Sequence, residues 1–214
     1  MDLKLHTGGN ELSRKRQGKR MLATYEATKI ELAKELVLLF ETFEEAMLKV
    51  NKSLHSFPVF TRSRTLEASI VQSCFAEILV KNFLGKAFFG KYKRLVLQAK
   101  GYVILFKKLD KKGYPMNIKT VNVQSMLNQN QMLDLFQDSD YNYDPIVFFG
   151  YKKNKIGQYV SPQLVYIDEN QVSFTIEPHD LQLPMNFRKP VVEDFEQQQI
   201  IPGLKNTSIK KEAK

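Results

Sequence analysis

The chain has 214 residues, 43% hydrophobic and 26% charged, with a formal net charge of +9 and an isoelectric point near 9.4. These values are ordinary for a soluble globular protein. No apolar run reaches the roughly 20 residues that span a bilayer, so we expect no membrane partner. The single cysteine, Cys74, excludes an intrachain disulfide and favours a cytoplasmic location. One cysteine and three scattered histidines offer no zinc site.

The basic residues are concentrated in two stretches. Residues 1–20 hold six Lys and Arg against two acidic residues, and residues 86–119 hold ten against Asp110 alone. Few apolar side chains in residues 1–20 could be buried, so we interpret this stretch as a flexible basic segment, with a nucleic-acid-binding arm as the alternative. Residues 188–214 have the composition of a loosely ordered basic tail. Residues 21–187 are expected to form a single domain.

Two amphipathic helices are predicted in the first half of this domain. Residues 22–50 lack Gly and Pro, and their apolar side chains recur every three or four positions, which makes one apolar stripe along a helix. A second helix is expected over residues 64–84, where Ser63 or Thr65 can cap the start and Gly85 can end it. We expect the two helices to pack as an antiparallel pair against one face of a sheet.

The second half of the domain is rich in strand-forming residues. Apolar, β-branched and aromatic side chains on both sides of Lys100-Gly101 predict a hairpin at residues 94–109. We interpret residues 116–123 as a further strand, and a helical spacing of apolar side chains returns over residues 123–136.

The clearest pattern lies in residues 145–177. In the first and third of its three segments, one set of side chains recurs with a period of two, which places that set on one face of a strand: Val147, Phe149 and Tyr151, and then Val172, Phe174 and Ile176. The breaks between them, residues 154–157 and 168–170, have the composition of short hairpin turns. The sequence therefore predicts a three-stranded antiparallel meander. The expected fold class is α+β, with the N-terminal helix pair packed on a mainly antiparallel sheet.

The predicted hairpin is the best candidate for a nucleic-acid-binding site. Binding to phosphates requires cations on one face, and binding to single strands adds aromatic side chains on which bases stack. Tyr102 and Phe106 lie among the basic residues of the hairpin, which could instead be a solvated outer face with its aromatic residues buried beneath it. The candidate site residues in and beside the hairpin are Lys91, Tyr92, Lys93, Arg94, Lys107 and Lys108.

Arg62 and Arg64 are a second candidate for anion binding. They flank Ser63 at the predicted start of the second helix, where free N–H groups favour anions. Two guanidinium groups at that position would suit a phosphate or a carboxylate. The alternative is that they form ion pairs with glutamates of the first helix or with Asp138, Asp140 and Asp144.

A metal-dependent nuclease is a third hypothesis. Such an enzyme needs two or three carboxylates that converge on Mg²⁺, commonly with a lysine nearby. Glu67 and Asp110 lie near the ends of predicted elements, and Lys108 or Lys119 could be the lysine. The residue two positions before Lys119 is an asparagine rather than an acid. We predict that Glu67 and Asp110 do not converge, and that Asp110 lies in an exposed turn.

No catalytic or cofactor motif stands out elsewhere in the sequence. The amide run at residues 128–131 could read adenine edges if it were exposed, although a polar helix face or a helix break is the plainer interpretation. We therefore expect a non-enzymatic protein that needs no metal or cofactor and binds DNA or RNA through the basic hairpin. The alternative is a protein-interaction module, such as an inhibitor or adaptor that docks on an acidic partner.

Overall fold

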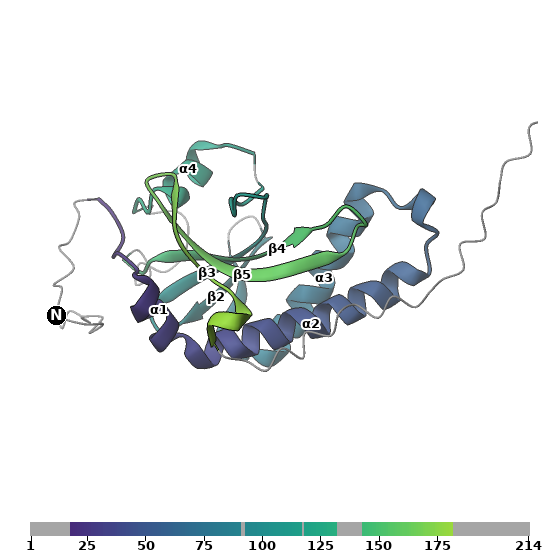
Figure 1. Ribbon diagram of the computed structural model, residues 1–214, viewed down its shortest axis with the longest axis horizontal. Helices are drawn as coiled ribbons and strands as arrows, with labels where there is room; N and C mark the ends of the chain where they lie inside the picture. The colour runs from purple at the N-terminus through teal and green to yellow at the C-terminus, as the bar shows by residue number, and fades with distance from the viewer. Residues whose placement is uncertain (1–17, 91–92, 117, 132–142, 182–214) are drawn as a thin grey trace, which may run out of the picture.

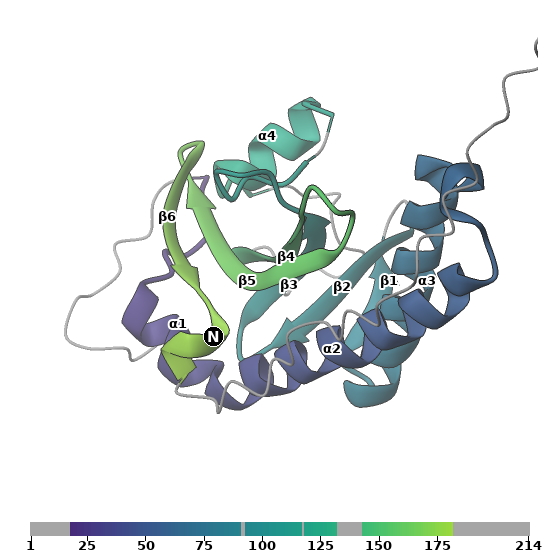
Figure 2. The ribbon, with the colours of Figure 1, turned by 45° about the vertical axis from the view of Figure 1, so that its right-hand side comes forward.

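The computed structural model describes residues 18–90, 93–116, 118–131 and 143–181. These residues build one six-stranded sheet with helices on both faces, as Figures 1 and 2 show. The helices are α1 (Tyr25–Glu31), α2 (Ala33–His55), α3 (Arg64–Asn82) and α4 (Val121–Leu127), with short 3-10 helices η1 (Val59–Thr61) and η4 (Pro178–Leu181). The strands are β1 (Ala87–Gly90), β2 (Arg94–Ala99), β3 (Tyr102–Lys108), β4 (Ile146–Lys153), β5 (Tyr159–Asp168) and β6 (Gln171–Ile176).

The helix pair α2 and α3 covers one face of the sheet, which confirms the α+β prediction (Figure 2). The predicted first helix is divided at Leu32 into α1 and α2, and α2 continues to His55. Helix α3 begins as predicted, because the Ser63 hydroxyl accepts a hydrogen bond from the N–H of Leu66 at 3.1 Å. No helix in the described part of the chain is long and apolar enough to cross a membrane.

Phe149 of β4 lies at the centre of the core between this helix pair and the sheet. Its ring centroid lies 5.5 Å from that of Phe40 in α2 and 6.2 Å from that of Phe75 in α3. Phe106 of β3 adds a fourth ring, 6.0 Å from Phe149. Offset and tilted ring pairs of this kind add stability beyond the apolar area they bury. The aromatic cluster therefore joins both helices to the two central strands.

The opposite face of the sheet is also covered, by α4 and the chain around it. Met126 of α4 and Leu109 pack there against a second set of buried strand residues, Val96, Val103, Leu105, Ile146, Phe148, Val165 and Ile167. The central strands are thus buried on both faces. This explains why residues 103–105 and 146–149 read as continuous apolar runs rather than as an alternation.

The strands follow one another across the sheet in the order of the sequence, β1 to β6. The predicted hairpin is β2–β3, and the predicted meander is β4–β5–β6. Glu169 and Asn170 both have positive φ angles, of 49° and 58°, as a tight primed turn requires. The one parallel pair is β3–β4, in which Leu105 pairs with Phe148 and Lys108 with Tyr151. The connection between these two strands carries α4.

The local structure differs from the prediction at two places. The described part of residues 116–123 contains no strand, because Thr120 caps a helix there: its hydroxyl accepts from the N–H of Val123 at 3.2 Å, and α4 begins at Val121. In addition, the four-residue edge strand β1 was not predicted. A strand this short, which ends at Gly90, has too few residues to show a period of two.

Gly150 allows a close approach between β3 and β4. A Cβ atom at this position would lie 2.3 Å from the carbonyl oxygen of Lys107 and 2.5 Å from Cγ of Leu109. Neither can move freely, since the first belongs to the backbone and Leu109 is buried. Leu109 also donates its N–H to the Tyr151 carbonyl at 2.8 Å, which extends the parallel pairing past the end of β3.

We predict that Gly150→Ala lowers the free energy of unfolding by about 1–3 kcal/mol, the usual effect of overpacking a dense interior. Gly90→Ala is the matched control, because a Cβ there comes no closer than 3.4 Å to the Val96 side chain. Urea denaturation of both variants checks this. Equal loss of stability in the two variants would contradict the role given to Gly150.

The amide run at residues 128–131 has a structural role. Gln129 is fully buried, with a φ angle of 51° just past the end of α4. Its side-chain amide donates to the carbonyls of Ile146 (2.8 Å) and Ile167 (2.7 Å), and its side-chain oxygen accepts from the Ile146 N–H (2.9 Å). Gln129 therefore satisfies backbone groups of β4 and β5, and it is not available to read base edges.

The chain before α1 is tied to the same region, which corrects part of the expected flexible segment. The Arg20 N–H donates to the Gln129 carbonyl at 2.7 Å, and its guanidinium donates to the Asp144 carbonyl at 2.8 Å. Burial lowers the pKa of Arg20 to about 10, and the charge of Asp144 opposes that shift. Residues 18–20 thus belong to the fold, whereas residues 1–17 and the predicted tail at 188–214 lie outside the described residues.

We predict that Gln129→Ala lowers the free energy of unfolding by about 2–4 kcal/mol, because it leaves buried backbone groups of β4 and β5 without partners. Gln124→Ala, at an exposed position of α4, should change it little. Thermal melts of the two variants measure the difference. If the two variants have the same melting temperature, the hydrogen bonds of Gln129 do not stabilise the sheet.

Candidate nucleic-acid interface

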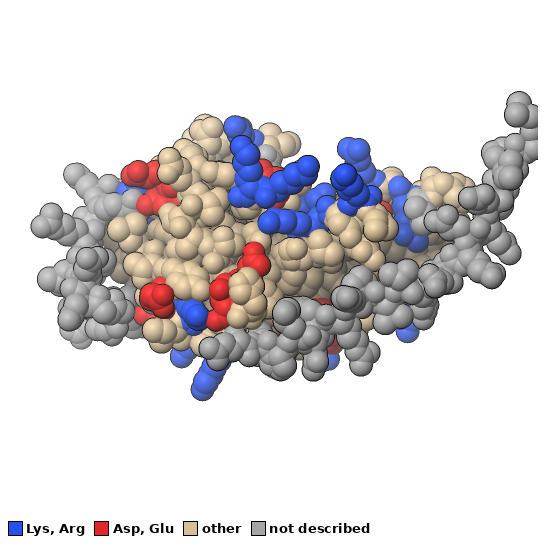
Figure 3. Space-filling model, in the orientation of Figure 1, with Lys and Arg blue, Asp and Glu red and all other residues tan. Residues whose placement is uncertain are grey.

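One end of the sheet collects basic side chains from three neighbouring strands. Strand β2 runs antiparallel to β3, and β4 runs parallel to it. The start of β2 therefore meets the ends of β3 and β4. We call this region the basic end of the sheet, and define it by Lys93, Arg94, Lys107, Lys108, Lys152 and Lys153. Figure 3 shows Lys and Arg side chains gathered on one stretch of the visible surface, near the tip of the β4–β5 hairpin.

The start of α3 lies at the same end of the sheet. Lys153 of β4 forms an ion pair with Glu67 in the first turn of α3, at 2.5 Å. Arg62, just before α3, is close enough to Tyr159 of β5 to affect it: burial raises the pKa of Tyr159, and the charge of Arg62 opposes that rise. Tyr159 pairs with Lys153 across the β4–β5 ladder. The structure thus brings Arg62 and the basic end together.

Arg62, just before α3, and Arg64, its first residue, differ in their exposure to solvent. Arg62 is half-buried and donates from Nε to the Phe57 carbonyl at 2.8 Å, whereas Arg64 is exposed. Within the described residues, neither guanidinium forms an ion pair with a carboxylate. Asp138 and Asp140, two of the partners considered from the sequence, lie outside the described residues.

The hairpin residues predicted from the sequence differ in their exposure. Lys93 is exposed, Lys107 and Lys108 are half-buried, and Arg94 is half-buried beside Met126. Lys91 and Tyr92 lie outside the described residues.

The aromatic residues of the hairpin are not exposed platforms for bases. Tyr102 is 2% exposed, and its hydroxyl donates to the Glu31 carboxylate at 2.8 Å. Phe106 packs in the core, 5.0 Å from Phe75. The interpretation in which aromatic side chains are buried beneath the basic hairpin holds for Tyr102, and Phe106 is half-buried against the core.

Sequence reasoning missed the lysines of β4. Lys152 and Lys153 follow the apolar part of that strand, and the exposed Lys155 lies in the turn after it. In the sequence they are far from Lys107 and Lys108. Only the parallel pairing of β3 with β4 puts the two lysine pairs side by side, since Lys108 lies opposite Tyr151. A charged pair at the end of each strand was the signal that could have suggested it.

The two carboxylates considered for a nuclease site each have a partner other than the second carboxylate. Glu67 pairs with Lys153. One Asp110 side-chain oxygen accepts from the N–H groups of Lys112 (2.8 Å) and Tyr114 (2.9 Å), so Asp110 lies in the predicted turn, in which Lys111 and Lys112 are exposed and Asp110 itself is half-buried. Across the described part of the chain, no three His, Cys, Asp or Glu side chains gather in a way that could hold a metal ion.

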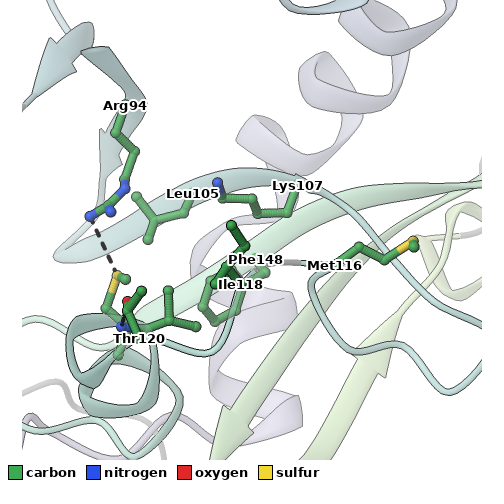
Figure 4. A pocket seen from close by; sticks show the side chains of 9 residues that line it. Arg94, Leu105, Lys107, Met116, Ile118, Thr120 and Phe148 are labelled. Carbon is green, nitrogen blue, oxygen red and sulfur yellow. Dashed lines mark hydrogen bonds between the residues drawn. The ribbon is translucent and has the colours of Figure 1, made fainter. Parts of the chain in front are cut away.

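A pocket of about 430 Å³ opens at the basic end, on the α4 face of the sheet (Figure 4). Lys107 and Arg94 lie on its strand side, and Arg94 approaches the sulfur of Met126 at 3.6 Å. Burial and the neighbouring charge of Arg94 lower the pKa of Lys107. The remaining lining residues are Leu105, Met116, Ile118, Thr120, Val123, Met126 and Phe148.

Comparison with known proteins assigns no function to this site. No protein-family model, no curated protein and no solved structure matches the chain. The function is therefore argued from the geometry and charge of the basic end.

We predict that Lys107→Met raises the melting temperature near neutral pH, because it removes a charge that is partly withdrawn from water beside Arg94. The folded-state pKa of Lys107 lies below its ordinary value of 10.5, so the unfolded state holds more protons between the two values. Between these two pKa values, Lys107 therefore makes the free energy of unfolding rise with pH. In Lys107→Met this part of the rise should be absent.

Thermal melts over a pH series, with Lys100→Met as an exposed control, measure both effects. A melting temperature that falls in Lys107→Met, with an unchanged pH dependence, would contradict the prediction.

Proposed function

We propose that the protein binds nucleic acid through the basic end of the sheet, without catalysing a reaction. The observation that carries this proposal is the convergence of six cationic side chains, five from β2, β3 and β4 and one from Lys93 just before β2, on one end of a single sheet. The carboxylate of Glu67 forms an ion pair with one member of this group, Lys153. A surface of this charge attracts the phosphates of a nucleic acid and releases their counterions.

Arg62 and Arg64 extend the proposed surface to the start of α3. Helix α3 has 19 residues, and its first N–H groups add partial positive charge at the end where Arg64 stands. The ion pair between Glu67 and Lys153 holds this helix start against the end of β4. A phosphate backbone could therefore run from the β2–β4 strand ends toward α3.

Contacts of this kind position a nucleic acid but do not read its sequence. Lysine and arginine side chains at strand ends can reach phosphates, whereas Tyr102 is buried and Phe106 packs against core rings, so neither is a free stacking platform. We therefore propose binding to DNA or RNA that depends strongly on salt and weakly on sequence. A cytoplasmic location, expected from the single cysteine, is compatible with such a partner and stays a prediction.

We predict that the double variant Lys108→Glu, Lys152→Glu weakens binding to a mixed-sequence oligonucleotide at low salt by at least ~10-fold, through the loss of phosphate contacts. The variant Lys34→Glu, Lys100→Glu makes the same change in charge at two exposed positions away from the basic end, and should weaken binding much less. Fluorescence anisotropy at a series of salt concentrations measures both the affinity and its salt slope.

The proposal would be wrong if the dissociation constant stayed above the millimolar range at low salt, or if it did not change with salt. It would also be wrong if both double variants lost the same affinity. Binding of polyglutamate by a protein that does not bind oligonucleotides would instead favour the alternative function, docking on an acidic protein partner.

A further inference from the structure

The pocket beside Lys107 and Arg94 is large enough to hold a small ligand. Its volume of about 430 Å³ falls within the range of roughly 300–1,000 Å³ that is usual for small-molecule sites. It lies between β3, β4 and the segment that leads into α4, where Figure 4 shows Lys107 and Leu105 on one side and Ile118 and Thr120 on the other. It opens at the basic end of the sheet, so a ligand in it would adjoin the proposed nucleic-acid surface.

The lining divides the pocket into a cationic part and an apolar part. Lys107 and Arg94 supply the two cations, and none of the described residues that line the pocket carries a carboxylate. Lys107 forms no ion pair with any residue that the structure describes, although it is half-buried. The apolar part consists of Leu105, Met116, Ile118, Val123, Met126 and Phe148. A ligand that suits both parts has an anionic group next to an apolar or aromatic body.

Thr120 adds one uncharged polar group to the lining. Its hydroxyl oxygen accepts from the Val123 N–H at 3.2 Å, which leaves the hydroxyl proton free to be donated. A flat ring that carries hydrogen-bond acceptors on its edge could use this donor while its faces contact apolar side chains. An alkyl chain could not use it.

We propose that this pocket binds a single unpaired nucleotide, with its base against the apolar lining and its phosphate beside Lys107 and Arg94. This inference rests on the proposed function and deepens it, because it assigns a preference for strands with unpaired bases. A base within a duplex is paired and stacked, so it cannot enter a pocket unless it leaves the stack. An unpaired base is already free to be splayed out and bound between side chains.

The test compares a labelled single strand with a blunt duplex of the same length, at one salt concentration, by fluorescence anisotropy. We expect the wild-type protein to prefer the single strand by ~10-fold or more, in line with the contribution of one bound base. Val123→Trp should fill the pocket and abolish this preference while duplex binding persists. Val121→Trp is the matched control, since Val121 lies on the same helix, is 79% exposed and does not line the pocket.

A thermal melt establishes that each variant is folded. If Val123→Trp does not fold, the variant Lys107→Met tests the pocket proposal instead. It should weaken single-strand binding more than duplex binding. Equal affinities for the two nucleic acids in the wild-type protein would overturn the pocket proposal, as would a preference that survives in folded Val123→Trp or an equal loss in Lys107→Met. Salt-sensitive binding to both nucleic acids would still support the proposed function, whereas binding to neither would overturn the proposed function as well.

Discussion

The parallel pairing of β3 with β4 is the constraint on which the rest of this structure depends. All other neighbouring strands are antiparallel, and each of those pairs is adjacent in the sequence. Had β4 run the other way, the lysines that end β3 and those that end β4 would lie at opposite ends of the sheet. The parallel register instead places Lys107 beside Gly150 and Lys108 beside Tyr151. The same pairing forces the chain between the two strands to cross one face, where it forms α4 and the pocket.

The cations gather where the central strands leave the core. Leu105 of β3 and Phe149 of β4 are buried, and charged side chains follow within a few positions of each. A charge placed further inside would lose its water without gaining a counter-ion, so it could not be accommodated between α2, α3 and α4. Lys107 lies at the boundary between the core and the solvent. It is half-buried, and its pKa is lowered by burial and by the charge of Arg94. The site and the core therefore meet at this residue.

Local patterns in the sequence were enough to predict the helix pair, the β2–β3 hairpin and the final meander. Each depends on the periodicity of apolar side chains or on a local cap such as Ser63. The features that were missed depend on contacts between distant parts of the chain. Nothing in the sequence indicates that Gln129 bonds to β4 and β5, and the lysine pair that contains Lys152 joins Lys108 only through the parallel pairing of distant strands. The predicted hairpin site therefore contained residues in and beside β2 and β3 but neither lysine of β4, Lys152 or Lys153.

The order of the strands has a consequence for how the protein folds. Strands β1 to β3 and strands β4 to β6 are two units whose pairings are local, and residues 109–145 join them. Local hairpins form quickly, whereas pairing across a long loop must first overcome the entropy of closing it. We expect the two units to form early and their docking along β3 and β4 to limit the folding rate. A newly made chain would then acquire its complete cationic surface only in the last step, together with the native state.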